Sequence, residues 1–252
     1  YSDHFVPLQP LDLQKVKDAD DLVAAMAKTA FGGRAVGEAA DVLYHMILDK
    51  ECLKVLTISG AMTVAKMGLV ICDMIDQGYV EVVVTTGALM AHGFVEAAGM
   101  QHFKYESSIM NDDELYKKGY DRVYDTLELE QNLDDAEEIV KKVLSTFSEG
   151  STVASHILNR ELGRYLADNS GGRAILKSAF LKKVPVFVPA FTDSEMGLDF
   201  AIFNKIQVIN GKKPLQYDPF IDLNQYTDLV FKAKKLGIFT IGGGVPRNWA
   251  QQ

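Results

Sequence analysis

The sequence lacks any apolar run close to the roughly 18 residues that a membrane-spanning helix needs. Residues 1–10 have neither the basic start nor the apolar centre of a signal peptide. Hydrophobic residues nevertheless make up 48% of the 252 positions, which is ample for a buried core. We therefore expect a cytoplasmic protein without a membrane partner, folded as a single α/β domain over residues 1–252.

Cysteine is scarce, and Cys52 and Cys72 are the only two in the sequence. One begins a predicted strand and the other lies in a predicted helix, so we expect buried thiols in a reducing compartment rather than a disulfide. His45 and His102 have no histidine or carboxylate neighbours at the spacing of metal ligands. The sequence therefore predicts no metal site and disfavours binuclear hydrolases, which need clustered aspartate and histidine.

Positive charge is also in deficit, since 26 lysines and arginines face 34 aspartates and glutamates, for a net charge of −8. A nucleic-acid surface would need a basic face, so we expect no nucleic-acid partner. An acidic protein mildly favours cationic ligands.

Three common nucleotide and nucleophile motifs are missing: G-x-G-x-x-G, the P-loop and the G-x-S-x-G elbow. What is present is an alternation of apolar, β-branched runs with amphipathic segments. This alternation predicts a doubly wound, mostly parallel, Rossmann-like sheet. The predicted strands are residues 52–58, 80–86, 184–188 and 238–241, and the main predicted helices are residues 19–31, 34–48, 59–76, 133–147, 152–167 and 222–236.

Small and hydroxylated residues follow each of the predicted parallel strands. In such sheets ligands bind outside the carboxyl ends of the strands. Glycine lets a backbone approach a ligand closely, hydroxyls donate hydrogen bonds, and a carboxylate accepts bonds from ribose hydroxyls. Together these features are typical of a dinucleotide site. The four segments are TISGAMT (57–63), VTTGAL (84–89), PAFTDSEMG (189–197) and IGGGVPRN (241–248).

The order and spacing of several motifs resemble the deoxyhypusine synthase family, and in particular its divergent deoxyhypusine synthase-like branch. The resemblance covers nearly the whole chain. The pair formed by P-x-F-x-P-A-x-T-D and a terminal G-G-G-V is fairly specific. The motifs are FGGRAV (31–36), SGAMT (59–63), VVVTTGAL (82–89), VPVFVPAFTDSEMG (184–197) and IGGGV (241–245).

This resemblance implies a homotetramer that binds NAD and transfers an aminobutyl group from spermidine. In the family, NAD oxidises a secondary amine to an imine, and a lysine of the enzyme captures the four-carbon unit. The unit then passes to a lysine of a translation-factor precursor and is reduced there. The alternatives are a homospermidine synthase-like or other amine-processing enzyme, and a non-catalytic NAD-binding oligomer.

The resemblance also implies which residues contact NAD. Asp193 matches an aspartate of the family that we expect to hold a ribose. Gly244 matches the last glycine of the family's triplet. The remaining expected contacts lie in the first two strand-end segments: Ser59, Gly60, Ala61, Thr63, Thr86, Gly87 and Ala88.

The sequence departs from the family where the polyamine binds. Ala91 and His92 replace a pair of glutamates that hold ammonium groups in the family. Glu195 and Asp199, four residues apart on a predicted helical turn, are candidate replacements for those carboxylates, and the alternative for them is a solvated acidic turn. His92 is a second candidate substrate contact, with a helix position facing another subunit as its alternative.

A histidine pair after the family's G-G-G-V is also replaced, by Asn248 and Trp249. Trp249 is either an aromatic wall for an alkylammonium chain or a core residue. The family's catalytic lysine lies further on, in a W-G-K segment that this sequence does not contain. We therefore expect a C-terminal catalytic segment to be missing, and the identity of the catalytic residue stays open.

Overall fold

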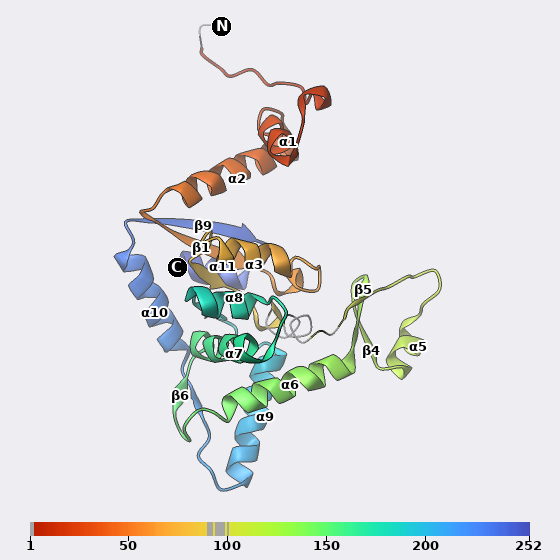
Figure 1. Ribbon diagram of the computed structural model, residues 1–252, viewed down its shortest axis with the longest axis vertical. Coiled ribbons are helices and arrows are strands. Elements are labelled where there is room, and N and C mark those ends of the chain that lie inside the picture. Colours follow the sequence, from red (N-terminus) through yellow and green to blue (C-terminus); the bar gives the residue numbers. More distant parts are fainter. Residues whose placement is uncertain (1–2, 90–92, 94–98, 100) are drawn as a thin grey trace. The chain divides into compact units, whose positions relative to one another are not determined.

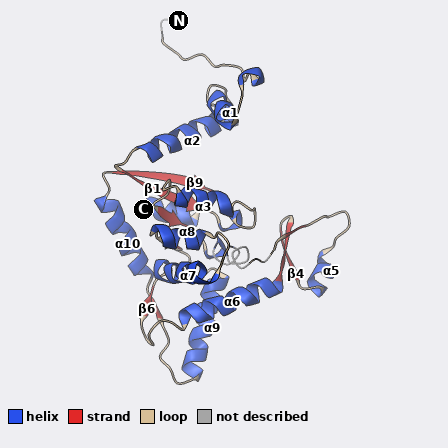
Figure 2. Cartoon of the chain, in the orientation of Figure 1, coloured by secondary structure: helices blue, strands red, loops and turns tan. Residues whose placement is uncertain are grey.

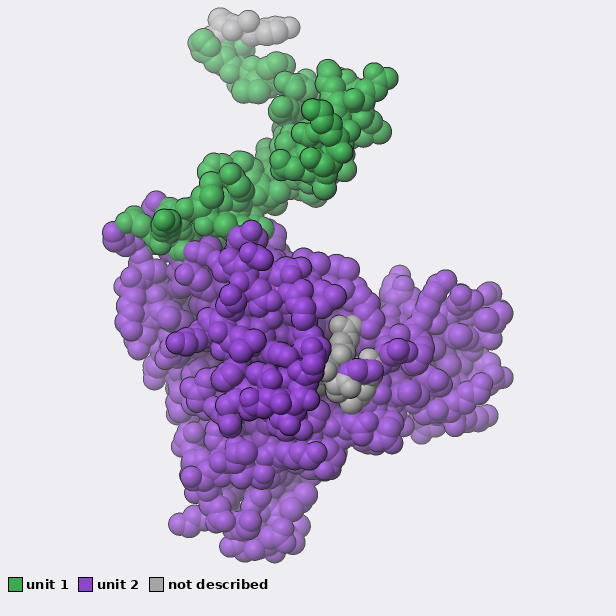
Figure 3. Space-filling view, in the orientation of Figure 1, with its two compact units in different colours: residues 1–52 green, residues 53–252 purple. Residues whose placement is uncertain are grey.

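The structure is a computed structural model that describes residues 3–89, 93, 99 and 101–252. The chain divides into two units, residues 1–52 and residues 53–252 (Figure 3).

The first unit is helical. Its elements are the short 3₁₀ helix η1 (Leu13–Lys15), α1 (Ala19–Met26) and α2 (Phe31–Leu48). Asp18 caps α1 by accepting a hydrogen bond from the backbone of Asp21. The predicted break at Gly32 and Gly33 was wrong, because both residues lie inside α2. A glycine costs a helix only about 1 kcal/mol, and the apolar periodicity that follows outweighs that cost.

A four-stranded sheet forms the centre of the second unit (Figures 1 and 2). Its strands are β1 (Cys52–Ile58), β2 (Val82–Val84), β7 (Val186–Phe187) and β9 (Lys235–Ile241), in the order β7-β2-β1-β9. The β1–β2 and β2–β7 pairs are parallel. This confirms the predicted α/β class with a mostly parallel sheet, although β2 and β7 are shorter than predicted.

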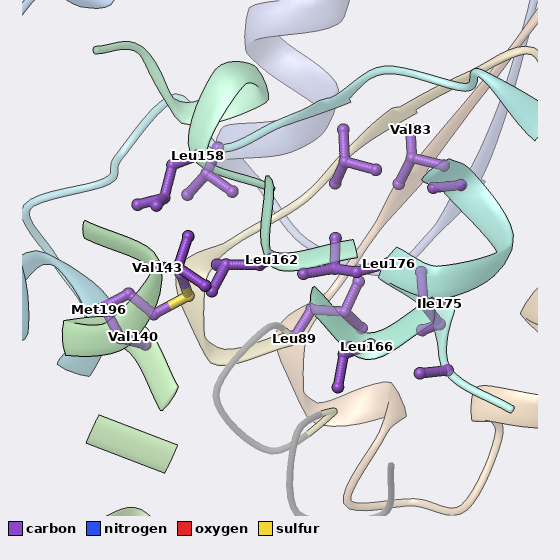
Figure 4. Close-up of a cluster of buried hydrophobic side chains, with 14 of the residues drawn as sticks. Val83, Leu89, Val140, Val143, Leu158, Leu162, Leu166, Ile175, Leu176 and Met196 are labelled. Atoms are coloured by element: carbon purple, nitrogen blue, oxygen red, sulfur yellow. The ribbon is translucent and has the colours of Figure 1, made fainter. Parts of the chain in front are cut away.

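Alternate residues of the strands enter two separate cores. Leu56 and Val83 face the larger core together with α3, α6, α7, α8 and α9, as Figure 4 shows for part of it. Val55 and Phe187 face the smaller core with α10 and α11. Because both faces of the sheet are covered by helices, the strands are apolar on both sides rather than alternating. The helices are α3 (Gly68–Asp76), α6 (Glu130–Leu144), α7 (Ser155–Asn169), α8 (Ile175–Lys182), α9 (Glu195–Ile209), α10 (Pro219–Lys232) and α11 (Val245–Gln251).

The polar segment before α6 holds three short strands and a short helix. The antiparallel strands β3 (Phe103–Lys104), β5 (Thr126–Leu129) and β4 (Tyr120–Val123) form a small sheet beside α5 (Asp112–Lys117). Elsewhere, β6 (Thr152–Val153) pairs with β8 (Gln216–Tyr217). No helix in the described part of the chain is long and apolar enough to cross a membrane.

The segment after β1 differs from the prediction. Ser59 precedes only the single 3₁₀ turn η2 (Gly60–Met62), and its side chain makes no capping hydrogen bond. The long helix begins later, at Gly68. Lys66 takes a positive φ of 63°, which no helix continues through, and this separates the turn from α3.

Candidate functional site

The loops that follow the four strands meet at one edge of the sheet, which we call the strand-end rim: residues 59–63, 85–89, 189–194 and 242–245. Hydrogen bonds link the loops in the order of the strands. The Ser59 backbone N–H donates to the Ile241 carbonyl at 3.0 Å, joining the ends of β1 and β9. The Thr85 hydroxyl donates to the Ile58 carbonyl at 3.1 Å, joining the ends of β2 and β1.

At two glycines of the rim, the backbone of one loop contacts a side chain of the next loop. A methyl group added at Gly60 would collide with the Thr86 hydroxyl and lie 2.7 Å from the Ala88 side chain. One added at Gly87 would collide with the Ser194 side chain. The sequence predicts that these glycines contact a ligand. In the structure, contact between neighbouring loops already requires glycine at both positions.

The contact at Gly87 brings Asp193 beside the Thr86 turn, since Ser194 is the next residue along the chain. Asp193 is exposed, and its own N–H donates to the Ala190 carbonyl at 3.0 Å in a tight turn. Ser194 caps α9, accepting from the Gly197 N–H at 3.2 Å and donating to the Phe191 carbonyl at 2.7 Å. Asp193 is thus exposed at a corner that hydrogen bonds hold in place.

The glycine triplet after β9 divides into two parts. Gly242 and Gly243 take positive φ angles of 69° and 82°, which favour glycine, and a methyl group on Gly243 would lie 3.6 Å from the Ser59 Cα. Gly244 has an ordinary φ of −90° and no atom within 4 Å of the place where its Cβ would be. Only the third glycine therefore borders open space.

In the first loop of the rim, some of the predicted ligand contacts are accessible and others are buried. Ser59 is half-buried and Ala61 is exposed, so both can meet a ligand. Thr63 is buried at 1% exposure, and its hydroxyl donates to the Gly60 carbonyl at 3.3 Å. The Thr63 hydroxyl therefore stabilises the turn rather than facing outwards, which its place in the sequence motif could not reveal.

Glu195 and Asp199 lie on one face of α9, as the predicted helical turn requires, and border a pocket of about 180 Å³ shared with α6. Burial, together with the negative charges of Glu137 and Glu195, raises the pKa of Asp199 to about 6, while Lys141 opposes this shift. Lys141 is already paired with Glu137 at 2.8 Å. The pocket is thus an acidic depression with apolar walls.

Trp249 packs in the smaller core rather than in the rim. Its ring lies 5.5 Å from that of Phe187 and 4.8 Å from that of Tyr226. Of the two predicted roles for Trp249, the structure favours the core residue. His92 and Ala91 lie outside the described residues.

No group of three or more potential metal ligands is found in the part of the chain that the structure describes. The charged cluster that sequence reasoning missed lies elsewhere: Asp222 of α10 is buried at 3% exposure and accepts from the backbone N–H groups of Ser155 and His156, both at 3.0 Å. It also pairs with the His156 ring at 2.6 Å. Because Asp222 and His156 lie 66 residues apart, no local sequence pattern predicted their contact.

A parallel sheet with helices on both faces and the chain order third, second, first, fourth strand belongs to the doubly wound class of α/β proteins. The model of the family "Deoxyhypusine synthase" matches residues 21–252. "Probable deoxyhypusine synthase 1" of Methanosarcina mazei is 37% identical over 233 residues, which cover 92% of this chain and 70% of that protein. The chain belongs to the deoxyhypusine synthase family.

A further sequence and a solved structure are also similar to this chain. A "Deoxyhypusine synthase-like protein" of Chlorobaculum tepidum is 33% identical over 91% of this chain and 65% of its own length. The crystal structure of an Entamoeba histolytica protein, named as a candidate deoxyhypusine synthase, shares the fold with a TM-score of 0.68 at 16% identity. The match covers 94% of this chain and 79% of that one.

The packing at Gly87 predicts unequal effects of adding a methyl group to two glycines of the rim. Gly87→Ala is expected to lower the free energy of unfolding by about 1–3 kcal/mol, because the methyl group overlaps Ser194. Gly244→Ala is expected to change it by less than about 0.5 kcal/mol. Urea denaturation measures both, and equal losses for the two variants would contradict the loop contact.

The raised pKa of Asp199 predicts a pH dependence of stability. With a folded pKa of about 6 against 3.8 in the unfolded chain, the folded state keeps a proton that the unfolded state releases between these values. The free energy of unfolding therefore falls as pH rises from about 4 to 6, by roughly 1 kcal/mol for a half-exposed group. Asp199→Asn removes this contribution.

The measurement is urea denaturation at pH 4.5 and pH 7.5, with Asp228→Asn on the exposed side of α10 as the matched control. If the difference between the two pH values stayed unchanged in Asp199→Asn, the acidic pocket would not perturb this carboxyl.

Proposed function

We propose that the strand-end rim binds NAD, and that the protein uses it to transfer an aminobutyl group from spermidine or a related polyamine to an amine acceptor. The observation that carries the proposal is the joining of four strand-end loops into one continuous edge, with an exposed carboxylate beside exposed backbone. Membership of the deoxyhypusine synthase family supports the reaction type. Strand order supports the place of binding, since such folds bind dinucleotides outside the carboxyl ends of their strands.

The residues of the rim fit a dinucleotide. Asp193 would accept hydrogen bonds from the hydroxyls of a ribose. The half-buried Thr86 and Ser59 would donate to phosphate or carboxamide oxygens. The space beside Gly244 would admit the cofactor to within contact distance of the backbone. When bound, NAD supplies an acceptor for a hydride taken from the carbon next to an amine nitrogen, which leaves an imine on the substrate.

The acidic pocket between α6 and α9 is suited to bind the polyamine substrate. Glu195 and Asp199 lie on the first turns of α9, directly after the Asp193 corner. An alkylammonium chain would place its methylene groups on the apolar wall and its charge against these carboxylates. Such a cation would lower the pKa of Asp199 from about 6 and hold the group ionised at neutral pH.

The acceptor and the assembly follow from the family alone. We include in the proposal a homotetramer, and a lysine of a translation-factor precursor as the acceptor. The replacement of the family's glutamate pair by Ala91 and His92 favours an altered amine substrate. A small amine, as in homospermidine synthase-like enzymes, is the second candidate acceptor.

Removal of the Asp193 carboxylate tests cofactor binding. Asp193→Ala is expected to weaken NAD binding by roughly ten- to a hundredfold, because charged hydrogen bonds of this kind contribute about 1.5–3 kcal/mol. Calorimetric titration of the folded protein with NAD gives the affinity. Asp228→Ala, which removes an exposed aspartate of α10, is the matched control and is expected to bind NAD unchanged. Equal affinity for both variants would remove Asp193 from the site.

Hydride transfer can be tested separately from the later steps, since oxidation of the amine precedes capture by any lysine. On mixing the protein with NAD and spermidine, we expect fluorescence of bound NADH to appear. Putrescine and agmatine serve as alternative substrates that distinguish the candidate reactions. If NAD binds but none of the three amines reduces it, the protein is a dinucleotide binder and the transferase proposal fails.

A further inference from the structure

A cavity of about 570 Å³ lies beside β7, at the end of that strand opposite the strand-end rim. β7 is one of the two edge strands of the sheet, and on its inner side the carbonyls of Phe187 and of the preceding Pro185 accept from the N–H groups of Thr85 and Val83. The other side of the strand faces α7. The cavity is bordered by α7, the end of α8, residues 183–186 and α10.

Side chains of α7 take the place of a neighbouring strand along this edge. Asn159 donates from Nδ2 to the Val186 carbonyl at 2.9 Å. The Val188 N–H donates to the Ser155 hydroxyl at 2.8 Å. These bonds satisfy the edge of the sheet without another strand. They also fix the orientation of the Asn159 amide, because a carbonyl only accepts and the NH₂ group must therefore face β7.

The carbonyl oxygen of the same amide, Oδ1, needs a hydrogen-bond donor. Asn159 is 2% exposed, and its Oδ1 has no hydrogen-bond partner among the described residues. A buried carbonyl oxygen normally has a partner, so each exception calls for an explanation. Asn159 borders the cavity, and a donor placed there would satisfy Oδ1.

His156, one turn earlier on α7, also borders this cavity. Its Nδ1 pairs with Asp222 at 2.6 Å, and that carboxylate is also fixed by two backbone N–H groups. Because a carboxylate only accepts, the ring carries a proton on Nδ1 in this pair. The carboxylate of Asp222 is thus engaged within the protein, and the uncharged Asn159 oxygen is suited to a neutral donor.

The remaining surroundings define the rest of the ligand. Apolar side chains form much of the wall, including Phe180, Val184 and Leu229. Arg160 and Lys183, both exposed, stand at the mouth and disfavour a cation. We infer that this cavity is a second ligand site, separate from the strand-end rim, for a neutral and largely apolar small molecule whose N–H donates to Asn159 Oδ1.

Matched pairs of probe molecules test this site. The probes are indole and benzimidazole, each compared with its N-methyl derivative, which keeps the shape and loses the donor. Saturation-transfer NMR with the whole chain gives the affinities. We expect each N–H member to bind at least about tenfold more tightly than its methylated partner, since the buried acceptor would otherwise stay unpaired.

Two variants locate the binding. Gln225→Trp fills the mouth from an exposed position of α10, and should abolish binding of all probes while leaving the circular dichroism spectrum unchanged. Asn159→Leu should bind both members of a pair alike, and if that variant does not fold, Gln225→Trp still decides the location. The inference is overturned if the members of each pair bind the unmodified protein equally. It is also overturned if no probe binds below millimolar concentration, which would assign the cavity to water.

Discussion

The contact between strand-end loops at Gly60 and Gly87 is the constraint on which the rest of the site depends. Each glycine leaves room for a side chain of the next loop, Thr86 at one contact and Ser194 at the other. A single methyl group at either place would push two loops apart. The position of Asp193 relative to the ends of β1 and β2 is therefore set by the absence of two side chains.

The strand β7 connects the two candidate sites. Its carboxyl end leads into the Asp193 corner, and its outer edge is hydrogen-bonded to Ser155 and Asn159 of α7. Asp222 in turn accepts from the first N–H groups of α7, where a helix N-terminus favours a negative charge. A buried carboxylate on α10 thus positions the helix that completes the edge of the sheet.

Much of the fold could be predicted from sequence because it follows from local patterns. The apolar runs of β1 and β2 and the small residues after them locate the sheet and its ligand edge. The failures also have physical causes. Gly32 and Gly33 proved compatible with α2, and Lys66 ended a helix path that Ser59 was expected to start. A motif gives a residue its place along the chain but not the direction of its side chain, which is why Thr63 was expected to face a ligand and is buried instead.

Long-range pairs escaped prediction for a different reason. The pairing of Asp222 with His156 and the bond from Asn159 to Val186 join segments that only the folded sheet brings together. Trp249 could be placed equally in a site or in a core until Phe187 and Tyr226 were seen beside it.

A crystal structure of the protein grown with NAD tests the central claim most directly. The account predicts electron density for the dinucleotide along the carboxyl ends of β1, β2, β7 and β9, with a ribose against Asp193 and the chain passing Gly244. Density for NAD at another place on the protein, with the Asp193 carboxylate in solvent, would contradict it.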